Sequence, residues 1–201
     1  MKTVTRSNHM KHLGMVALML NLGVAAVYAQ QQPVKMTFSG TEGASAINLQ
    51  VADTHTGDKH TGEFNFAGKG TLGSFTFRNV EANGDFPQQS SSCQANQVYV
   101  ETIAGAGVFR FQDGSLLKVK LTEGFDCIDF VAMQAHCTRT FKITGGTGRF
   151  KDASGVLTLT ETVVPVLADA LGNPVFFAAT GEFTGTVSGV AREADHQEEQ
   201  Q

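Results

Sequence analysis

Residues 143–155 read Ile-Thr-Gly-Gly-Thr-Gly-Arg-Phe-Lys-Asp-Ala-Ser-Gly and lead directly into an alternating segment at 156–160, Val-Leu-Thr-Leu-Thr. Four glycines surround one aromatic residue: Gly145, Gly146, Gly148 and Gly155. Glycine permits positive φ angles and close approach of backbones, which tight corners between strands require. The stretch therefore predicts a strand, a glycine corner and a second strand. It does not predict a phosphate loop, because no Lys-Ser or Lys-Thr follows the glycines and a strand, not a helix, comes next.

The rest of the chain has short alternating segments broken by Gly, Asn and Asp, which is typical of an all-β protein. It has 201 residues with 22 Gly and no Trp, and no window sustains a 3.6-residue apolar repeat. Asp113-Gly114 predicts a two-residue type I′ hairpin turn, and residues 104–107 predict a second tight turn. The pattern favours an antiparallel β-barrel of about eight strands over βαβ units. Strands are expected near 34–39, 46–52, 61–68, 72–80, 97–103, 107–112, 115–122, 137–144, 155–164 and 175–189, the last of which could be two strands.

The first 29 residues have the features of a secretory signal peptide. Lys2, Arg6 and Lys11 precede an apolar run at 15–26, and Val27-Tyr28-Ala29 provides a cleavage site. The alternative is a retained anchor, although the run is short for a membrane-spanning helix. We therefore expect a signal peptide at 1–29, a barrel domain at 30–190 and a flexible polar tail at 191–201, in a protein that is secreted or periplasmic and not stably inserted in a membrane.

Charge excludes one class of partner. The chain has 15 Lys and Arg, and removal of the three in the signal peptide leaves 12 against 19 Asp and Glu, a formal charge of −7. Nucleic acids and anionic membrane surfaces bind clustered Lys and Arg, which this chain lacks. We expect no nucleic-acid partner.

Three triplets place pairs of phenyl rings on one face of the sheet, because residues two apart in a strand share a face. They are Phe64-Asn65-Phe66, Phe75-Thr76-Phe77 and Phe109-Arg110-Phe111, and Tyr99 extends the pattern. One interpretation is a packed barrel core. The other is an aromatic cavity for an apolar ligand, since eight-stranded barrels can hold one small molecule. The cavity candidates are Phe64, Phe66, Phe75, Phe77, Tyr99, Phe109 and Phe111.

Two glutamates share a face with apolar neighbours. Glu161 alternates with Leu157, Leu159 and Val163, and Glu101 alternates with Tyr99. A carboxyl group inside an apolar barrel is a candidate general acid or ligand anchor. The alternative is that both lie at the barrel rim, because a one-residue slip in register reverses the faces.

The sequence gives little support for a metal site, a serine nucleophile or a cofactor. His55 and His60 flank one loop and His136 adjoins Cys137, but this spacing matches no metal-binding motif, so solvated histidines and no metal are expected. Ser90-Ser91-Ser92 lacks the Gly-x-Ser-x-Gly pattern of a nucleophile elbow. No cofactor is expected.

Three cysteines, Cys93, Cys127 and Cys137, allow one disulfide and one remaining thiol, with intermolecular pairing as another option. Cys127 and Cys137 lie on either side of one loop between neighbouring strands, whereas the strand count places the Cys93 loop at the opposite barrel end. This favours Cys127–Cys137, with Cys93 as the alternative partner if one strand is miscounted. The chain has no Cys-x-x-Cys pair, so a redox role is not expected.

The glycine corner and the strand after it resemble the glycine-rich segment of the allene oxide cyclase and dirigent barrels. They are most similar to a group of bacterial secreted proteins with an allene oxide cyclase-like barrel. Residues 109–117 and the closing segment 181–189 resemble the same group. Allene oxide cyclases bind an unsaturated fatty-acid epoxide and guide its cyclisation, and dirigent proteins orient phenoxy radicals for coupling. The catalytic residues of these families match no position here, so the resemblance implies a fold and no catalytic residue.

These observations lead to one expected function and two alternatives. We expect a non-catalytic secreted barrel that binds an apolar small molecule or has a structural role, and that could form homo-oligomers as related barrels do. The alternatives are an allene oxide cyclase-like isomerase for a lipid-like substrate, with Glu161 or Glu101 as the acid, and dirigent-like guidance of radical coupling. A cavity that holds an interior carboxyl group would favour the isomerase, and a solid core would exclude both alternatives.

Overall fold

A computed structural model describes residues 30–45, 60–84, 88 and 90–191. The predicted signal peptide, the predicted strand at 46–52, His55 and residues 192–201 of the predicted tail lie outside the described residues. No helix in the described part of the chain is long and apolar enough to cross a membrane.

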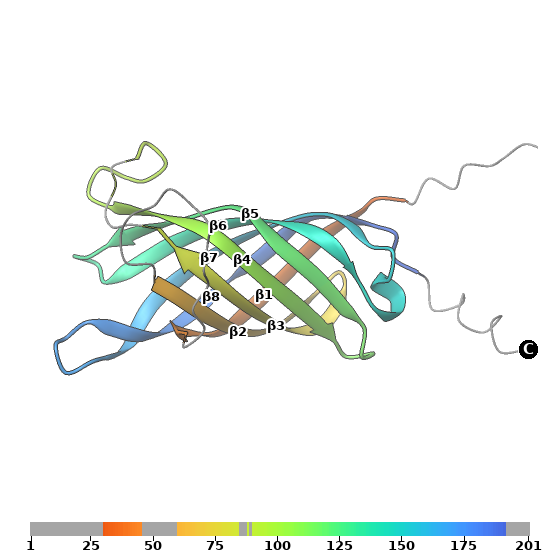
Figure 1. The fold of residues 1–201 in the computed structure, drawn as a ribbon, viewed down its shortest axis with the longest axis horizontal. Helices are drawn as coiled ribbons and strands as arrows, with labels where there is room; N and C mark the ends of the chain where they lie inside the picture. The colour runs from red at the N-terminus through yellow and green to blue at the C-terminus, as the bar shows by residue number, and fades with distance from the viewer. Residues whose placement is uncertain (1–29, 46–59, 85–87, 89, 192–201) are drawn as a thin grey trace, which may run out of the picture.

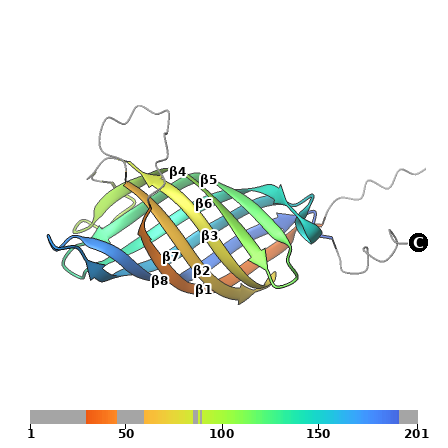
Figure 2. The same cartoon turned by 60° about the horizontal axis from the view of Figure 1, so that its bottom comes forward.

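Eight antiparallel strands form a closed barrel in which each strand pairs with the next and the last pairs with the first (Figures 1 and 2). The predicted all-β antiparallel barrel is therefore confirmed. A single turn of 3-10 helix, η1 (Gly148–Phe150), joins the sixth and seventh strands. The strands are β1 (Gln32–Ala44), β2 (His60–Gly70), β3 (Gly73–Asn83), β4 (Val98–Phe111), β5 (Leu116–Asp129), β6 (Gln134–Gly146), β7 (Ser154–Ala168) and β8 (Pro174–Ser188).

The two ends of the barrel differ. We call the end where β1, β3, β5 and β7 finish the open end, which lies at the left of Figure 1 with the β7–β8 hairpin. The opposite end, at the right, carries η1 and the β4–β5 turn, and we call it the closed end. Side chains fill the closed end, so the cavity of the barrel lies at the open end.

The glycine corner closes the barrel. Gly148 has φ +56°, and a Cβ on Gly146 would overlap the carbonyl oxygen of Leu116, so both positions require glycine. This backbone directs the Phe150 ring into the barrel, where it is fully buried, with its centroid 4.7 Å from that of Phe111. The predicted strand, corner and strand are confirmed.

Arg149 covers the Phe150 ring from the outside of the barrel. Its guanidinium lies 4.4 Å from the centroid of the Phe150 ring, pairs with Asp113 at 2.8 Å and donates a hydrogen bond to the Leu72 carbonyl oxygen at 2.6 Å. The corner is thus tied to the β2–β3 and β4–β5 turns, which are its neighbours at the closed end.

Phenylalanine rings fill the half of the barrel next to the closed end. In all three Phe-x-Phe triplets both rings are buried and the middle residue is exposed, as the alternation predicts. Ring centroids are 4.3 Å apart for Phe38 and Phe66, 4.4 Å for Phe77 and Phe109, and 4.8 Å for Phe109 and Phe183. Such dense aromatic packing contributes much of the hydrophobic stabilisation of the barrel.

Register shifts in the two strands β4 and β5 separate this packed half from the open half. The β3–β4 pairing shifts between Ala82 and Asn83, and the β5–β6 pairing shifts between Leu121 and Glu123. A β-bulge of this kind reverses which residues of a strand face inward. Phe109 and Leu121 point into the barrel on the closed side, whereas Val100, Thr102, Gly124 and Asp126 are buried on the open side.

Two predicted turns differ from the structure. Residues 104–107 lie within the continuous strand β4, because the small residues there accommodate the bulge instead of a turn. The Asp113-Gly114 turn exists, but the amide of Phe111 bonds the carbonyl oxygen of Ser115 and only Gly114 of the two has positive φ. This is a longer loop with glycine in the left-handed region, not a two-residue type I′ turn.

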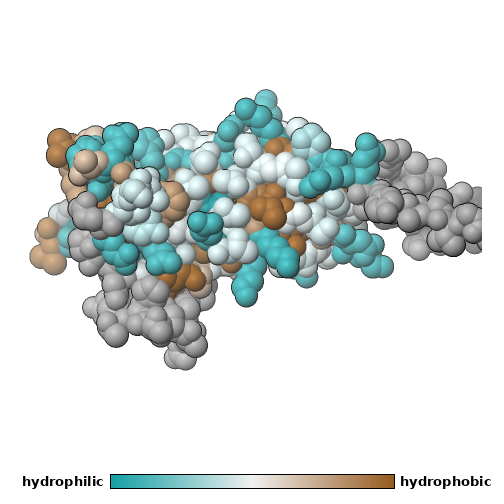
Figure 3. Space-filling model, turned by 90° about the horizontal axis from the view of Figure 1, so that it is seen from above, coloured by the Kyte–Doolittle hydropathy of each residue, from teal (hydrophilic) through white to brown (hydrophobic). Residues whose placement is uncertain are grey.

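The outer wall is largely polar. In the view of Figure 3, hydrophilic and neutral side chains cover most of the barrel wall, and apolar side chains occur in small groups. The most exposed large apolar residues, Val131 at 92% and Leu171 at 87%, lie in the β5–β6 and β7–β8 turns of the open end.

Candidate functional site: a cavity with an ionic floor

The open half of the barrel contains a cavity of about 770 Å³. All eight strands contribute side chains or backbone to it, together with Gly84, Asp169 and Asn173 from the connecting segments. Its volume lies in the usual range for pockets that hold small molecules. The apolar wall consists of Phe64, Val100, Ile128, Val163, Val175 and Phe177.

The floor of the cavity is ionic. It presents Glu42 from β1, Glu81 from β3, Asp126 from β5 and Arg139 from β6. Glu161 from β7 lies behind them, with a side chain that is 0% exposed. Charged groups are rarely buried to this degree unless they pair with one another.

Arg139 organises the floor. Its Nε donates to Oε2 of Glu81 at 2.7 Å, and its Nη2 lies 2.6 Å from Oε1 of the same carboxyl group. Nη1 donates to Oε1 of Glu161 at 2.9 Å, and Nη2 also lies 3.1 Å from Oδ1 of Asp126. The Phe64 ring covers the guanidinium, with its centroid 4.8 Å from Cζ. Arg139 therefore joins three strands inside the barrel.

Local sequence makes room for these large side chains. The cross-strand partner of Arg139 on β5 is Gly124, and that of Glu81 on β4 is Gly105. A Cβ on Gly124 would lie 3.1 Å from Cγ of Arg139, and a Cβ on Gly105 would lie 3.2 Å from Cβ of Glu81. Both distances are tight, so glycine at these positions leaves space for the ion pair.

Burial raises the pKa of the three glutamates of the site. Desolvation raises the pKa of Glu42 from 4.5 to about 7, although the nearby Arg139 charge opposes this shift. Desolvation also raises the pKa of Glu81, with Arg139 again opposing, and raises that of Glu161, where the Glu42 charge adds to the effect. The cavity thus contains one carboxyl group, that of Glu42, that can hold or release a proton near neutral pH.

The carboxyl groups of Glu42 and Glu161 are hydrogen-bonded to each other, which requires a proton on one of them. Oδ1 of Asn83 is buried and has no hydrogen-bond partner among the described residues. An unsatisfied buried acceptor is costly.

The structure places the two predicted acids, Glu161 and Glu101, on opposite sides of the barrel wall. Glu161 points into the barrel and contacts Arg139, but it does not line the cavity. Glu101 lies on the opposite side of β4 from the buried residues Val100 and Thr102, so the interior position considered for it is not the one the structure shows. The bulge in β4 is the reason, because it reverses the alternation that extends from Phe109.

Most of the aromatic residues predicted to line a cavity do not line it. Phe64 lines the cavity, whereas Phe66, Phe75, Phe77, Phe109 and Phe111 belong to the hydrophobic core of the barrel. Tyr99 shares the outer side of β4 with Glu101 and stacks on Phe125, with centroids 5.5 Å apart, so it does not line the cavity. The barrel is therefore packed in one half and hollow in the other.

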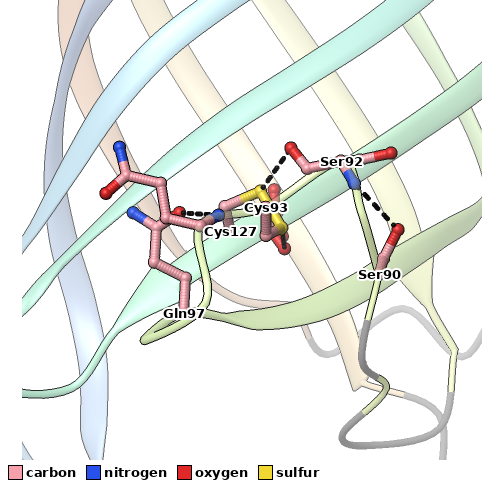
Figure 4. The surroundings of a disulfide bond; sticks show 7 residues. Ser90, Ser92, Cys93, Gln97 and Cys127 are labelled. Atoms are coloured by element: carbon pink, nitrogen blue, oxygen red, sulfur yellow. Dashed lines mark hydrogen bonds between the residues drawn. A yellow bond between two sulfur atoms is a disulfide. The ribbon is translucent and has the colours of Figure 1, made fainter.

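The disulfide joins Cys93 to Cys127, so the favoured Cys127–Cys137 pairing is wrong and the alternative partner is the correct one (Figure 4). Asp126 is the register partner of Cys137 and faces inward with it, which places Cys127 on the outer face of the wall. The strands predicted at 97–103 and 107–112 are one strand, β4, and counting them as two places the Cys93 loop at the wrong end of the barrel.

The loop that carries Cys93 is further held by its own hydrogen bonds. The Ser92 amide donates to Oγ of Ser90 at 3.2 Å, and the Gln94 amide donates to Oε1 of Gln97 at 3.0 Å. Gln88 forms an isolated bridge with Tyr99 at the start of β4. The triple-serine segment is thus part of a tethered loop on the outer wall, next to the disulfide (Figure 4).

Cys137 keeps a free thiol inside the barrel. Burial raises its pKa well above the usual value, and the charge of Asp126 adds to this effect. A thiol in this state is a poor nucleophile.

His136 is the one histidine of the sequence analysis whose side chain the structure describes. His136 lies on the exposed side of β6, with Nδ1 3.2 Å from Oγ1 of Thr162. Within the ranges that the structure describes, no group of three or more His, Cys, Asp or Glu side chains is placed to hold a metal ion.

Sequence reasoning found Glu161 but missed the four charged residues of the floor itself. Arg139 alternates with Cys137, Phe141 and Ile143, and Glu81 alternates with Phe75 and Phe77, so the argument applied to Glu161 would have found both. Glu42 follows Val34, Met36 and Phe38 in the same way. Asp126 could not be found by alternation, because the bulge in β5 reverses its face.

Comparisons with known proteins assign no family. No protein-family model matches the chain, and no curated protein matches it. Among solved structures, the pterocarpan synthase dirigent protein PsPTS1 is 13% identical with a TM-score of 0.41, over 81% of this chain and 97% of that one. The pterocarpan synthase dirigent protein GePTS1 is 10% identical with a TM-score of 0.35, over 90% and 99%.

A third similar structure is a nonspecific heme-binding cyclase that catalyses a 4 + 2 cycloaddition during neoabyssomicin biosynthesis. It is 13% identical with a TM-score of 0.34, over 85% of this chain and 76% of that one. At these TM-scores the likenesses assign neither a fold family nor a function to the chain.

Proposed function

We propose that this protein binds one apolar small molecule in the open-end cavity. The observation that carries the proposal is the cavity itself, which has about 770 Å³ of space and an apolar wall inside a barrel whose other half is filled. A concave apolar site with a few convergent polar groups is the usual form of a small-molecule site. The polar groups of the floor would fix the orientation of the ligand.

A second candidate function is acid-assisted isomerisation or cyclisation of a lipid-like substrate. The raised pKa of Glu42, about 7, favours this candidate because a general acid works best near the ambient pH. Glu42 lines the cavity and would donate its proton to a substrate oxygen as a bond rearranges, and then recover a proton from the product. Dirigent-like guidance would use the same cavity without this proton transfer.

We also propose that the protein works outside the cytoplasm, in the periplasm or as a secreted protein. The Cys93–Cys127 disulfide supports this location, because disulfides persist in oxidising compartments. The features of residues 1–29 as a signal peptide agree with it. We further propose that the chain forms homo-oligomers, which light scattering would detect.

The binding proposal is tested by titration with the fluorescent apolar probe N-phenyl-1-naphthylamine. The chain contains no Trp, so the background fluorescence is low. We expect saturable binding of one probe per chain. Ala135→Trp would fill the cavity and abolish binding, whereas His136→Trp, on the exposed side of the same strand, would leave it unchanged. Absence of saturable binding to the wild-type chain, or equal binding by both variants, would contradict the proposal.

The isomerase candidate is tested separately with unsaturated fatty-acid epoxides as substrates. We expect turnover by the wild-type chain and a loss of at least about a hundredfold in Glu42→Gln, which is the usual contribution of a general acid. Probe binding without turnover would leave the binding function and exclude this one.

A further inference from the structure

We propose that the outer wall of the barrel carries a second binding site, a basic patch over β3–β6 that binds an extended anionic polysaccharide. The patch consists of Arg78, Arg110, Lys118, Lys120 and Lys142, all of which are exposed. Because it lies outside the barrel, the proposal does not depend on the ligand of the open-end cavity. Strand register, missing counterions and the side chains between the charges point to this ligand.

Strand pairing brings the basic patch together. Arg78 on β3 and Lys118 on β5 are both cross-strand partners of Val108 on β4. Arg110 shares the face of Val108, two residues along β4, and Lys120 shares the face of Lys118 in the same way. The sequence contains no run of Lys and Arg, so the absence of clustered cations that it led us to expect is wrong for the folded chain.

Two cations of the patch face each other directly. Lys120 on β5 is the cross-strand partner of Lys142 on β6. Like charges directly opposite each other in a sheet are destabilising. A bound polyanion would remove this repulsion, because each ammonium group would gain an anionic neighbour.

The basic patch lacks counterions within the described residues. None of its five cations forms an ion pair there, whereas Lys35 on β1 pairs with Glu182 at 3.3 Å. Glu63 and Glu123 flank the patch in the register of the sheet, opposite Val80 and Thr140, but form no ion pair with it. The whole chain has 15 Lys and Arg against 19 Asp and Glu, so this excess of positive charge is local.

The spread of the charges favours a long ligand over a single small anion. The patch occupies four neighbouring strands, whose axes span about 14 Å at about 4.8 Å per strand. Its cations therefore form a band across the strands and do not converge on one point. A linear polymer with repeated anionic groups can contact several of them at once, and each further contact is then intramolecular.

The side chains between the cations favour a polysaccharide over a nucleic acid. They are exposed, and they are aliphatic or carry a hydroxyl group: Thr76, Ala106, Val108 and Thr144. Single-stranded nucleic acids bind aromatic side chains on which their bases stack, and none of these four residues is aromatic. Threonine hydroxyl groups can instead exchange hydrogen bonds with sugar hydroxyl groups. The proposed location outside the cytoplasm agrees with such a ligand.

The test uses heparin, a linear sulfated polysaccharide, as the probe. Fluorescein-labelled heparin is titrated with the full chain at several NaCl concentrations, and its fluorescence anisotropy reports binding. We expect saturable binding, with a slope of log affinity against log salt of about −3 to −4.5, as five contacts of about 0.7 to 0.9 released counterions each would produce. Neutral dextran is expected not to bind.

A matched pair of double variants locates the site. Lys120→Gln with Lys142→Gln should weaken heparin binding at least about tenfold at low salt and make the slope shallower by about 1.4 to 1.8. Lys35→Gln with Lys69→Gln removes the same charge from β1 and β2, away from the patch, and should leave affinity within about twofold. The urea midpoint of Lys120→Gln should stay the same or rise, because the variant relieves a like-charge pair.

Three outcomes would overturn the inference. The first is that heparin does not bind the wild-type chain, and the second is that both double variants lose affinity equally. The third is that single-stranded oligothymidine binds at least as tightly as heparin, because the ligand of the patch would then be a nucleic acid.

Discussion

Arg139 and Glu81 form a two-point ion pair across the inside of the barrel, with Nε 2.7 Å from Oε2 and Nη2 2.6 Å from Oε1. The two residues come from β6 and β3, which are not neighbours in the sheet, and their side chains are 2% and 1% exposed. The pair separates the phenylalanine core from the cavity, so it supports both the fold and the site.

Replacement of Arg139 by Ala should lower the free energy of unfolding by about 3–5 kcal/mol, because buried carboxyl groups would lose their cation. Urea unfolding followed by circular dichroism measures this change. Arg110→Ala on the exposed side of β4 is the matched control and should change stability by no more than about 0.5 kcal/mol. Similar losses in both variants would show that the buried pair has no special role.

Stability should fall as pH rises from about 5 to 8. The pKa of Glu42 is about 7 in the folded protein and 4.5 ordinarily, so between these values the folded state binds a proton that the unfolded state has lost. Stabilisation by this proton is present at low pH and is lost as pH rises through 7. The raised pKa values of Glu81 and Glu161 act in the same direction.

For Glu42 alone the change over this range is about 3 kcal/mol. Urea unfolding at pH 5, 6, 7 and 8 measures the slope, which should become shallower in Glu42→Gln and stay unchanged in Glu123→Gln. A stability that rises with pH over this range would disagree with the raised pKa values.

The disulfide should stabilise the protein and leave one hidden thiol. Removing it in the double variant Cys93→Ala with Cys127→Ala should cost about 2–4 kcal/mol, the usual contribution of a natural disulfide. A thiol reagent should detect one thiol per chain, Cys137, in denaturant without reductant and almost none in the native protein. A reactive native thiol, or loss of the disulfide in Cys137→Ala, would favour the other pairing.

The bulges make a prediction about which side chains face solvent. Thr102 is 3% exposed and Glu123 is exposed, although an unbroken alternation from Phe109 and Leu121 would reverse both. Thr102→Cys should therefore react slowly with a bulky maleimide and Glu123→Cys quickly, each measured in a Cys137→Ala background. The reverse order would mean that β4 and β5 run without bulges.

The barrel and its closed end could be predicted from the sequence because local patterns specify them. Phe-x-Phe alternation identified the core face, and the glycines of the corner identified the turn that places Phe150. The bulges in β4 and β5 could not be predicted, since they depend on pairing between strands and not on either strand alone. The differences between expectation and structure for Tyr99, Glu101 and the Cys127 pairing all occur on these two strands.

The ionic floor was predicted in part. Alternation singled out Glu161 but was not applied to Arg139 or Glu81, whose neighbours show the same pattern. That Glu42, Glu81, Asp126 and Glu161 converge on one guanidinium follows from the register of a closed barrel, which no single segment of sequence contains.

The most direct test of the central claim, that the open half of the barrel is a binding cavity, is a crystal structure of the protein with 12-bromo-1-dodecanol. Anomalous scattering from bromine locates the chain independently of the protein atoms. We expect one bromine peak within the barrel, in contact with residues of the apolar wall toward the open end such as Ile128 or Val175. A folded barrel with bromine only on its outer surface, or with none bound, would contradict it.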